Sequence, residues 1–538
     1  FNNEKITLGH SLLSITSNPA EATQPWKSQR GNILVYNGEI FNYKDLIEKY
    51  KNKFKPKTIC DTELLSWLLD NYSYEEILSK IIDSMHSFAY YNVNSNELIL
   101  SRDHAGIKPL YFSLNKSGII FSSEIKGLLN FVEKSNKIDR LALACTSMLG
   151  VNVLRQTIFS GIYKVLPGET IIFSLDKKQI SRTFRTIIKP ISNKKLDNDE
   201  FKTMTSKAIQ NSTLGIRKFG IFLSGGIDSS LVAFELKNYL TELSSFTNIM
   251  EPNEIINGED HNSDAKIAKI FSNEFLLNHK EIKITPNIIL QNWDESIKAI
   301  EEPRYNWNLP MYYHTNKFLS QNNIVVTMAG DIGDEIYGGY SHYFRMKEMV
   351  NKPKNWSDFI RLWMNKFHAP INLNIKFNND DLHDLLLQTL PEEIWNPNDI
   401  VNSAMALDCI TTVSEDFFSR NDKYGMAFSM EGRFPLASKK YMEYCLSINS
   451  DYKIGNTVSD CKLPVKLSYK NKIPENILNK YKTGWSVPIT KWLQDSSELK
   501  NKCAMTINKE DGIKEIINDN NYKDNPKRII VAWMMRTW

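Results

Sequence analysis

The stretch FGIFLSGGIDSS, residues 219–230, decides the fold. It begins as an apolar run, breaks off into Ser224-Gly225-Gly226, and continues with one carboxylate and two hydroxyls. The residues that follow, SSLVAFELKNYL (229–240), have the composition of a helix. A buried strand, a glycine-rich turn and a helix in this order predict one unit of a parallel α/β sheet, with the turn at the carboxyl end of the strand.

The same turn predicts an anion-binding site. Its backbone N–H groups and the positive end of the following helix point to one place, and glycine lets the backbone approach the anion closely. Asp228 would repel a phosphate directly, so we expect it to hold Mg²⁺ that bridges to the phosphates. The alternative is a strand–turn–helix unit that binds nothing, in which the glycines only allow the tight turn. The full pattern SGGxDSS favours phosphate binding, although it is not the GxxxxGK[ST] pattern of γ-phosphoryl transfer.

A second stretch of the same kind is VVTMAGDIGDEIYGGY, residues 325–340. It is a strand that ends in a turn rich in glycine and acidic residues. Open α/β sheets bind ligands where the carboxyl ends of neighbouring strands meet, so we expect the two turns to face one another. The acidic residues Asp331, Asp334 and Glu335 could bind a metal or orient a nucleophile. A solvated acidic turn is the alternative for this stretch alone.

Composition excludes several classes of protein. The 538 residues carry a net charge of +4 without a basic run interleaved with aromatics, which argues against a nucleic-acid partner. Six scattered cysteines form no CxxC pair, so we expect neither zinc nor disulfides, and a reducing, cytoplasmic location. No apolar run approaches the ~20 residues of a membrane span. We expect small-molecule partners, and the sequence leaves a homodimer open.

The residue patterns divide the chain into two parts. Residues 1–188 are rich in short apolar runs typical of strands, at 32–41, 97–103, 118–125 and 169–175. A helix is expected from Asp61, with Asp61 as its N-cap. The polar, lysine-rich residues 189–200 predict a linker.

From residue 201 to 538 strands alternate with amphipathic helices, which predicts a doubly wound parallel sheet. Residues 350–400 are irregular and rich in Asn, Lys and Trp, and we expect a helical insertion there.

The two glycine-rich turns resemble the PP-loop of ATP pyrophosphatases and, as a pair, the synthetase domain of asparagine synthetases. Three further stretches are similar to that family: Glu302-Pro303, RNDKYGMAFSMEGRFPL (420–436) and CKLPVKLSYKNKIPENILNKYKTGWSVPITKWL (461–493). The resemblance implies that ATP adenylates a carboxylate and that pyrophosphate leaves.

The resemblance also implies roles for single residues. Asp331 and Lys462 would be catalytic, with Lys462 stabilising charge on the phosphates. Asp228 and Asp334 would hold Mg²⁺. The ATP-binding residues would be Leu223, Ser224, Gly225, Gly226, Asp228, Ser229, Ser230, Asn248, Ala329, Gly330 and Lys482.

The N-terminal part resembles the class II glutamine amidotransferase domain in YNGEIFNY (36–43), DTELL (61–65) and SRDHAGIKPLYF (101–112). This implies an αββα sandwich of the N-terminal-nucleophile type, here without its first strands. Asn37 and Gly38 would form an oxyanion hole, and Glu39 and Asp61 would hold the amino group of glutamine.

The N-terminal part also departs from this family. The family's N-terminal nucleophilic cysteine and its Arg-Gly-Pro-Asp segment do not precede "LGH" (8–10), and we expect a truncated copy, with native loss as the alternative. Leu12 stands where the family has the arginine that grips the glutamine carboxylate. Asp331 stands where many members have Glu, and "PLAS" (435–438) replaces Pro-[FL]-Leu-Asp.

Three functions remain in competition at this point. The first is an amide ligase that adenylates aspartate and amidates it with ammonia from glutamine. The second is a related ligase for another carboxylate, such as a sugar acid, a peptide or a ring-closing substrate, with an inactive glutaminase domain. The third is a non-catalytic scaffold. For the first function we expect the glutamine pocket to face the adenylating site across mostly apolar surface.

Overall fold

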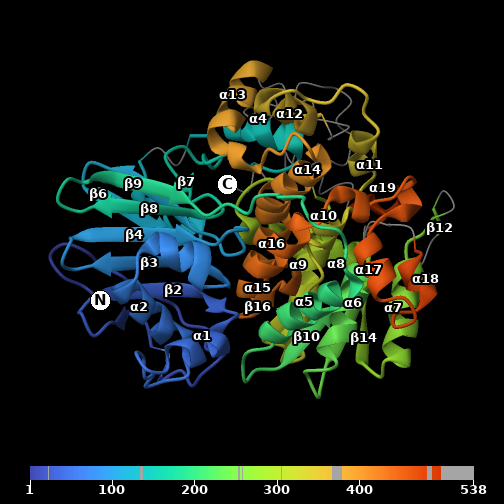
Figure 1. Ribbon diagram of the computed structural model, residues 1–538. Helices are drawn as coiled ribbons and strands as arrows, with labels where there is room; N and C mark the ends of the chain where they lie inside the picture. The colour runs from blue at the N-terminus through green and yellow to red at the C-terminus, as the bar shows by residue number, and fades with distance from the viewer. Residues whose placement is uncertain are drawn as a thin grey trace.

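The computed structural model describes residues 1–21, 23–133, 137–252, 255–256, 259–304, 306–365, 378–480 and 487–498. Figure 1 shows two halves side by side, with the strands of the N-terminal half in blue and green and the C-terminal half in green to red. We call residues 1–188 the N-terminal half and residues 201–538 the C-terminal half.

Two antiparallel sheets form the N-terminal half. A six-stranded sheet has the order β1 (Trp26–Lys27), β2 (Ile33–Ile40), β3 (Ser84–Asn92), β4 (Glu97–Arg102), β8 (Glu169–Ser174), β9 (Gln179–Arg185). A three-stranded sheet has the order β6 (Gly118–Ser122), β5 (Tyr111–Asn115), β7 (Tyr163–Lys164). All four strands that the apolar runs predict are present.

Alternation along β2 explains how these layers stack. Ile33 and Val35 join the core between the two sheets, whereas Leu34 and Tyr36 join the core beneath helices α1 (Tyr43–Tyr50) and α2 (Asp61–Asn71). On the far side, Tyr111 of the three-stranded sheet packs with Ala142 of α4 (Arg140–Leu149). The order is therefore helix, sheet, sheet, helix, as in the expected αββα sandwich.

The prediction that Asp61 caps α2 is wrong. The N-cap is Cys60, and Asp61 is the first residue of the helix. Its Oδ2 atom accepts hydrogen bonds from the Tyr36 hydroxyl and the Ile40 N–H, both at 3.0 Å. The carboxylate turns towards β2 because that strand offers two donors in the interior, and it ties the helix to the sheet.

A five-stranded parallel sheet forms the centre of the C-terminal half. Its order is β14 (Asn278–Ile284), β11 (Ser244–Met250), β10 (Phe219–Phe222), β15 (Val326–Met328), β16 (Glu431–Arg433). Side chains of α5 (Asn198–Asn211), α6 (Ile227–Leu236) and α7 (Ser263–Glu274) share one core cluster. Those of α8 (Pro286–Ile300) and α9 (Leu309–Gln321) share another. The expected doubly wound parallel sheet is confirmed.

Strand order creates a crevice between β10 and β15. The chain leaves β10 through α6 towards β11, on one side, and leaves β15 towards β16, on the other. The two strands pair directly, with Gly220 opposite Thr327 and Ile221 opposite Met328. Their carboxyl ends therefore open together at the point where the sheet changes direction, which is where such sheets bind ligands.

Helices fill the rest of the C-terminal half (Figure 1). The predicted insertion at 350–400 contains α12 (Trp356–Met364) and α13 (Asn379–Thr389) in its described parts. Asp408 of α14 (Ile400–Asp408) fastens α12 to α11 (Ser341–Lys347), because it accepts hydrogen bonds from the Trp363 indole at 2.7 Å and the Tyr343 hydroxyl at 2.8 Å.

The remaining helices of this half are α10 (Gly333–Tyr337), α15 (Ser419–Met426), α16 (Lys439–Ser447), α17 (Leu463–Ser468), α18 (Glu475–Leu478) and α19 (Ile489–Asp495). None of the helices in the described ranges has the length and apolar character needed to cross a bilayer.

The predicted linker lies on the C-terminal half. The Lys194 N–H donates to the carbonyl of Ser447 at 2.9 Å, and the Asn396 side chain donates to the carbonyl of Pro190 at 2.9 Å. Residues 189–197 are thus held along α16, and α5 begins immediately after them.

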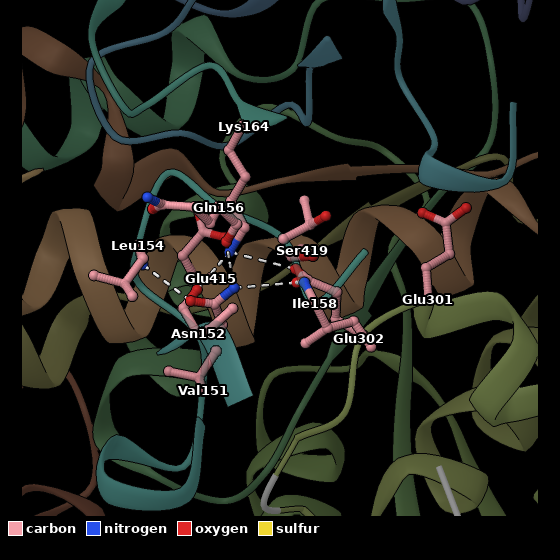
Figure 2. A network of polar contacts seen from close by, with 12 residues as sticks. Val151, Asn152, Leu154, Gln156, Ile158, Lys164, Glu301, Glu302, Glu415 and Ser419 are labelled. Atoms are coloured by element: carbon pink, nitrogen blue, oxygen red, sulfur yellow. Dashed lines mark hydrogen bonds and ion pairs between the residues drawn. The ribbon is translucent and has the colours of Figure 1, made fainter. Parts of the chain in front are cut away.

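The two halves meet across both apolar and charged surface. Leu149, Val151 and Leu154 of the N-terminal half share a core cluster with the C-terminal half, which fits the expected apolar contact. The contact also contains buried ion pairs, which the prediction of a mostly apolar surface did not include. Figure 2 shows Lys164 beside Glu415 and Glu302, with Nζ to carboxylate distances of 2.9 and 3.3 Å.

Each buried charge in this network has several partners. Arg102 also pairs with Glu415, at 3.0 Å. Glu302 accepts hydrogen bonds from the Asn152 side chain at 3.2 Å and from the Ile158 N–H at 3.1 Å (Figure 2). The Glu-Pro pair of the sequence is therefore a contact between the halves.

We expect Glu415→Gln to lower the free energy of unfolding by about 3–5 kcal/mol, because Arg102 and Lys164 would stay buried with less negative charge. Burial alone would raise the pKa of Glu415, but Lys164 and Arg102 outweigh it and lower the pKa from 4.5 to about 2. A lowered folded-state pKa stabilises above the unfolded value and loses that effect as the pH falls through the folded value. The variant should therefore differ most from wild type at neutral pH and least near pH 2.

Thermal unfolding midpoints of both proteins across this pH range would test the expectation. Glu48→Gln is the control, because Glu48 pairs with Lys51 on the surface and its side chain is 73% exposed. A surface pair contributes about 0–1 kcal/mol. Equal midpoints for Glu415→Gln and wild type at neutral pH would contradict the role of the network.

Candidate active site

The turn after β10 forms the floor of the site. Gly225 has φ +74°, and a Cβ atom there would overlap the carbonyl oxygen of Asp264. The hydroxyls of Ser224 and Ser229 lie 3.0 Å apart, and the Gly226 N–H donates to the Ser224 hydroxyl at 3.3 Å. The loop thus gathers hydroxyls and backbone N–H groups at the N-terminus of α6, which is the arrangement that an anion needs.

The turn after β15 lies directly against this floor. A Cβ atom on Gly330 would lie 2.6 Å from the carbonyl carbon of Asp228, and one on Gly333 would lie 2.5 Å from its side-chain Cγ. Any other residue at these positions would push the turns apart. The predicted meeting of the two turns is confirmed, and glycine is what permits it.

Lys462 joins the two turns through their carboxylates. Its Nζ atom lies 2.7 Å from Oδ1 of Asp334 and also contacts Oδ2 of Asp228. The side chain is buried, and burial by itself would lower the pKa of Lys462. The carboxylates of Asp228 and Asp334 outweigh burial and raise this pKa above its ordinary value. The structure therefore brings together three residues that the sequence places far apart.

The two carboxylates fit a magnesium ion. Carboxylate oxygens are the ligands that Mg²⁺ prefers, and the contacts with Lys462 show that both can reach a single cation. In the described part of the chain, no group of three or more His, Cys, Asp or Glu side chains could hold a metal. Two protein carboxylates suit Mg²⁺, because this ion usually keeps several waters and binds phosphates besides one or two carboxylates.

A cavity of about 390 Å³ opens above the two turns. Most of the predicted site residues line it: Ser224, Gly226, Asp228, Ser229, Ala329, Gly330, Asp331, Asp334 and Lys462. Leu223, Gly225, Ser230 and Asn248 belong to the adjoining strands, loop and helix without lining it. Asn248 is buried on β11 and accepts a hydrogen bond from the Thr315 hydroxyl at 3.0 Å. Lys482 lies outside the described residues.

Arg420 is a lining residue to which the sequence analysis gave no role. It forms two hydrogen bonds of 2.9 Å with the carboxylate of Asp416, and its guanidinium lies 4.2 Å from the ring centre of Tyr312. Burial by itself would lower the pKa of Arg420. Asp416 and other groups, including Asp331, outweigh burial and raise this pKa above its ordinary value. The stretch 420–436 contains Arg420 and could have identified it.

Other lining residues carry no comparable signal in the sequence. Tyr312 and Phe417 come from helical segments outside both glycine-rich turns, and Asp264, on α7, forms an ion pair with Lys480. Only the folded arrangement of the helices brings them to the carboxyl edge of the sheet.

A second cavity, of about 480 Å³, lies in the N-terminal half. The four residues predicted to recognise glutamine line it together: Asn37, Gly38, Glu39 and Asp61. Leu12 lines it too, with 38% of the residue exposed. No Lys or Arg belongs to the lining within the described residues, so no guanidinium or ammonium replaces the missing arginine there.

Carboxylates dominate the chemistry of this second cavity. Burial raises the pKa of Asp61 to about 6. Burial also raises the pKa of Glu39, against the opposing effect of Arg433, whose Nη2 lies 2.7 Å from Glu39 Oε2. Arg433 lies on β16, so a strand of the C-terminal half holds a residue of the N-terminal cavity.

Helix α15 lies between the two cavities. Arg420 and Asn421 line the first, whereas Asp422 and Met426 line the second. Lys108 of the N-terminal half pairs with Asp422 at 3.0 Å and fixes this helix against the antiparallel sheets. Side chains of one helix therefore line both cavities.

Comparisons with known proteins agree with this arrangement. The family model described as asparagine synthase matches residues 200–525, and the glutamine amidotransferase domain matches residues 1–184. Asparagine synthetase (glutamine-hydrolyzing) 1 of Bacillus subtilis is 24% identical over 536 residues, which cover 92% of this chain and 82% of that protein. Asparagine synthetase (glutamine-hydrolyzing) 3 of the same organism is 22% identical over 534 residues, 93% of this chain and 84% of that protein.

The synthase match covers more than half of the chain and contains both glycine-rich turns, Lys462 and Arg420. The amidotransferase match contains all four predicted glutamine-recognition residues. The order of the two matched regions is also the order of the two halves. The chain is an enzyme of the carbon–nitrogen ligase type and belongs to the asparagine synthase family.

Proposed function

We propose that this enzyme uses ATP to adenylate a carboxylate, with aspartate as the leading candidate, and then converts the adenylate to an amide with ammonia. The observation that carries the proposal is the convergence of Asp228, Asp334 and Lys462 at the carboxyl ends of β10 and β15. Such a cluster suits ATP because it offers an anion cradle, two metal ligands and a cation for the phosphates.

The first step forms the adenylate. A carboxylate oxygen of the acceptor attacks the α-phosphorus of ATP, the bond to the bridging oxygen breaks, and pyrophosphate leaves. The loop of Ser224–Ser229 would hold the phosphates through its N–H and hydroxyl groups, and Lys462 would stabilise charge as it develops. Mg²⁺, held by Asp228 and Asp334, would neutralise the pyrophosphate when bound.

The second step forms the amide. Ammonia attacks the carbonyl carbon of the adenylate and AMP leaves with the electron pair of the broken bond. The nitrogen loses a proton in this step, and Asp331, which lines the cavity, would accept it. Arg420 lines the same cavity as Asp331, and its guanidinium would orient the acceptor.

The second cavity would deliver ammonia from glutamine. Asn37 and Gly38 would form the oxyanion hole, Glu39 and Asp61 would bind the amino group, and the nitrogen would pass α15 to reach the adenylate. The five described cysteines are free thiols, which suits a reducing, cytoplasmic location.

An alternative function has an observation of its own. Leu12 and the absence of Lys and Arg from the described lining of the second cavity leave an α-carboxylate there without a cation. The alternative is therefore a ligase for another carboxylate, such as a sugar acid, a peptide or a ring-closing substrate, in which glutamine is not used.

We expect Asp228→Ala to reduce pyrophosphate release by about a hundredfold or more, because it removes one of the two carboxylates that would hold the Mg²⁺ bound to the phosphates. A coupled assay of pyrophosphate would measure this, and the thermal midpoint would show that the fold persists. Asp199→Ala is the control, since Asp199 is a surface residue of α5 that pairs with Lys202. Unchanged pyrophosphate release in Asp228→Ala would refute the adenylation site.

We expect the full-length protein to form amide efficiently from ammonium chloride and poorly from glutamine. Burial of an α-carboxylate beside Leu12 without a partner costs several kcal/mol, whereas ammonia needs no such contact. Amide formation with each nitrogen source would be measured over a concentration series.

Leu12→Arg supplies the missing cation and should lower the KM for glutamine without changing the KM for ammonium. Efficient use of glutamine by the wild type at sub-millimolar concentration would contradict our interpretation of the cavity. Pyrophosphate release without amide from either source would favour the alternative function.

A further inference from the structure

The ammonium group of Lys462 contacts both of the carboxylates, Asp228 and Asp334, that would hold a metal ion. We propose that Lys462 occupies the magnesium position in the nucleotide-free enzyme, and that the metal enters only when the phosphates of the nucleotide draw Lys462 away from the carboxylates. The inference rests on the proposed function, because it assumes that these carboxylates serve a metal–nucleotide complex.

The contacts support mutual exclusion of the two cations. Lys462 Nζ lies 2.7 Å from Asp334 Oδ1 and also contacts Asp228 Oδ2, so it bridges the two carboxylates. Gly339 packs against this bridge, and a Cβ atom on it would overlap Asp334 Oδ1 and lie 2.7 Å from Lys462 Cε. On this side the ammonium group and the carboxylate are closely packed, so a second cation on the same two oxygens would have to displace Lys462 from them.

The backbone of Lys462 restricts the change to its side chain. The residue has φ +55° and ψ +37°, and its carbonyl accepts hydrogen bonds from the N–H groups of Val465 and Lys466, both at 3.1 Å, at the start of α17. The next N–H, of Leu463, donates to the carbonyl of Lys453 at 2.9 Å. The backbone that follows Lys462 is therefore held in place, whereas its four-carbon side chain borders the cavity into which we expect it to move.

Charge explains why the exchange needs a nucleotide. Lys462 carries a positive charge, so a divalent cation added beside it would meet a like charge at close range. Phosphates bring negative charge that attracts both the metal and Lys462. Nucleotide and metal would therefore bind together, and the free enzyme would bind the metal weakly.

Lys466 provides a matched control in the same cavity. Its Nζ atom donates to the carbonyl of Ser459 at 2.6 Å and lies 3.9 Å from Cys461 Sγ. Lys462→Met and Lys466→Met remove the same charge, but only the first removes the ammonium group that contacts both Asp228 and Asp334.

The experiment measures Mn²⁺ binding by the loss of the free-ion signal in electron paramagnetic resonance. Wild type, Lys462→Met and Lys466→Met are titrated with and without α,β-methylene-ATP, and circular dichroism and the thermal midpoint verify folding. We expect wild type and Lys466→Met to take up Mn²⁺ only with the nucleotide analogue. Lys462→Met should bind Mn²⁺ without it, at least about tenfold more tightly than wild type. Lys462→Gln takes its place if the methionine variant does not fold.

Two results would overturn the inference. One is wild type that binds Mn²⁺ alone as tightly as Lys462→Met, and the other is a folded Lys462 variant that gains no binding without nucleotide. Calorimetric titration of wild type with α,β-methylene-ATP and metal distinguishes either of these two results from a failure of the proposed function. If the analogue and metal still bind, only the exchange fails. If wild type binds no analogue, the nucleotide site and the inference both fail.

Discussion

Pairing of buried charge is the constraint on which this structure depends. Glu415 lies between Arg102 and Lys164, and Glu302 shares Lys164 while accepting hydrogen bonds from the opposing chain segment. A buried charge that loses its partner is costly, so each half can adopt its observed contact surface only against the other. The same helical region that carries Glu415 continues into α15, whose side chains line both cavities.

The active site also requires the backbones of the two glycine-rich turns to approach one another closely. The sheet order opens a crevice between β10 and β15, but the crevice becomes a site only because glycine at 330 and 333 lets the two turns touch, and glycine at 225 lets the first turn approach α7. Lys462 then connects the carboxylates of both turns from a third segment of the chain. Three distant stretches thus meet at one point, and the shared cavity follows from backbone geometry as much as from side-chain chemistry.

Much of this could be predicted from the sequence, because strands and glycine-rich turns have local signatures. The parallel sheet, its two turns and their meeting are visible in residues 219–230 and 325–340. Asp61 shows where local reasoning fails, because a strand that is distant in sequence offers its carboxylate better partners than its own helix does. Tyr312 and Asp264 reach the cavity through helix packing, and the pairing of Lys164 with Glu415 is a long-range match of charges that no local pattern contains.

The mixed apolar and charged contact between the halves has a consequence for handling the chain. A severed apolar interface exposes surface that aggregates, whereas severed ion pairs leave Lys, Arg and Glu side chains that water solvates well. The contact here contains both kinds of surface, because Leu149, Val151 and Leu154 share a core cluster with the C-terminal half while Lys164 pairs with Glu415. Separated halves would therefore expose apolar surface, and the covalent linker keeps that surface covered at any protein concentration.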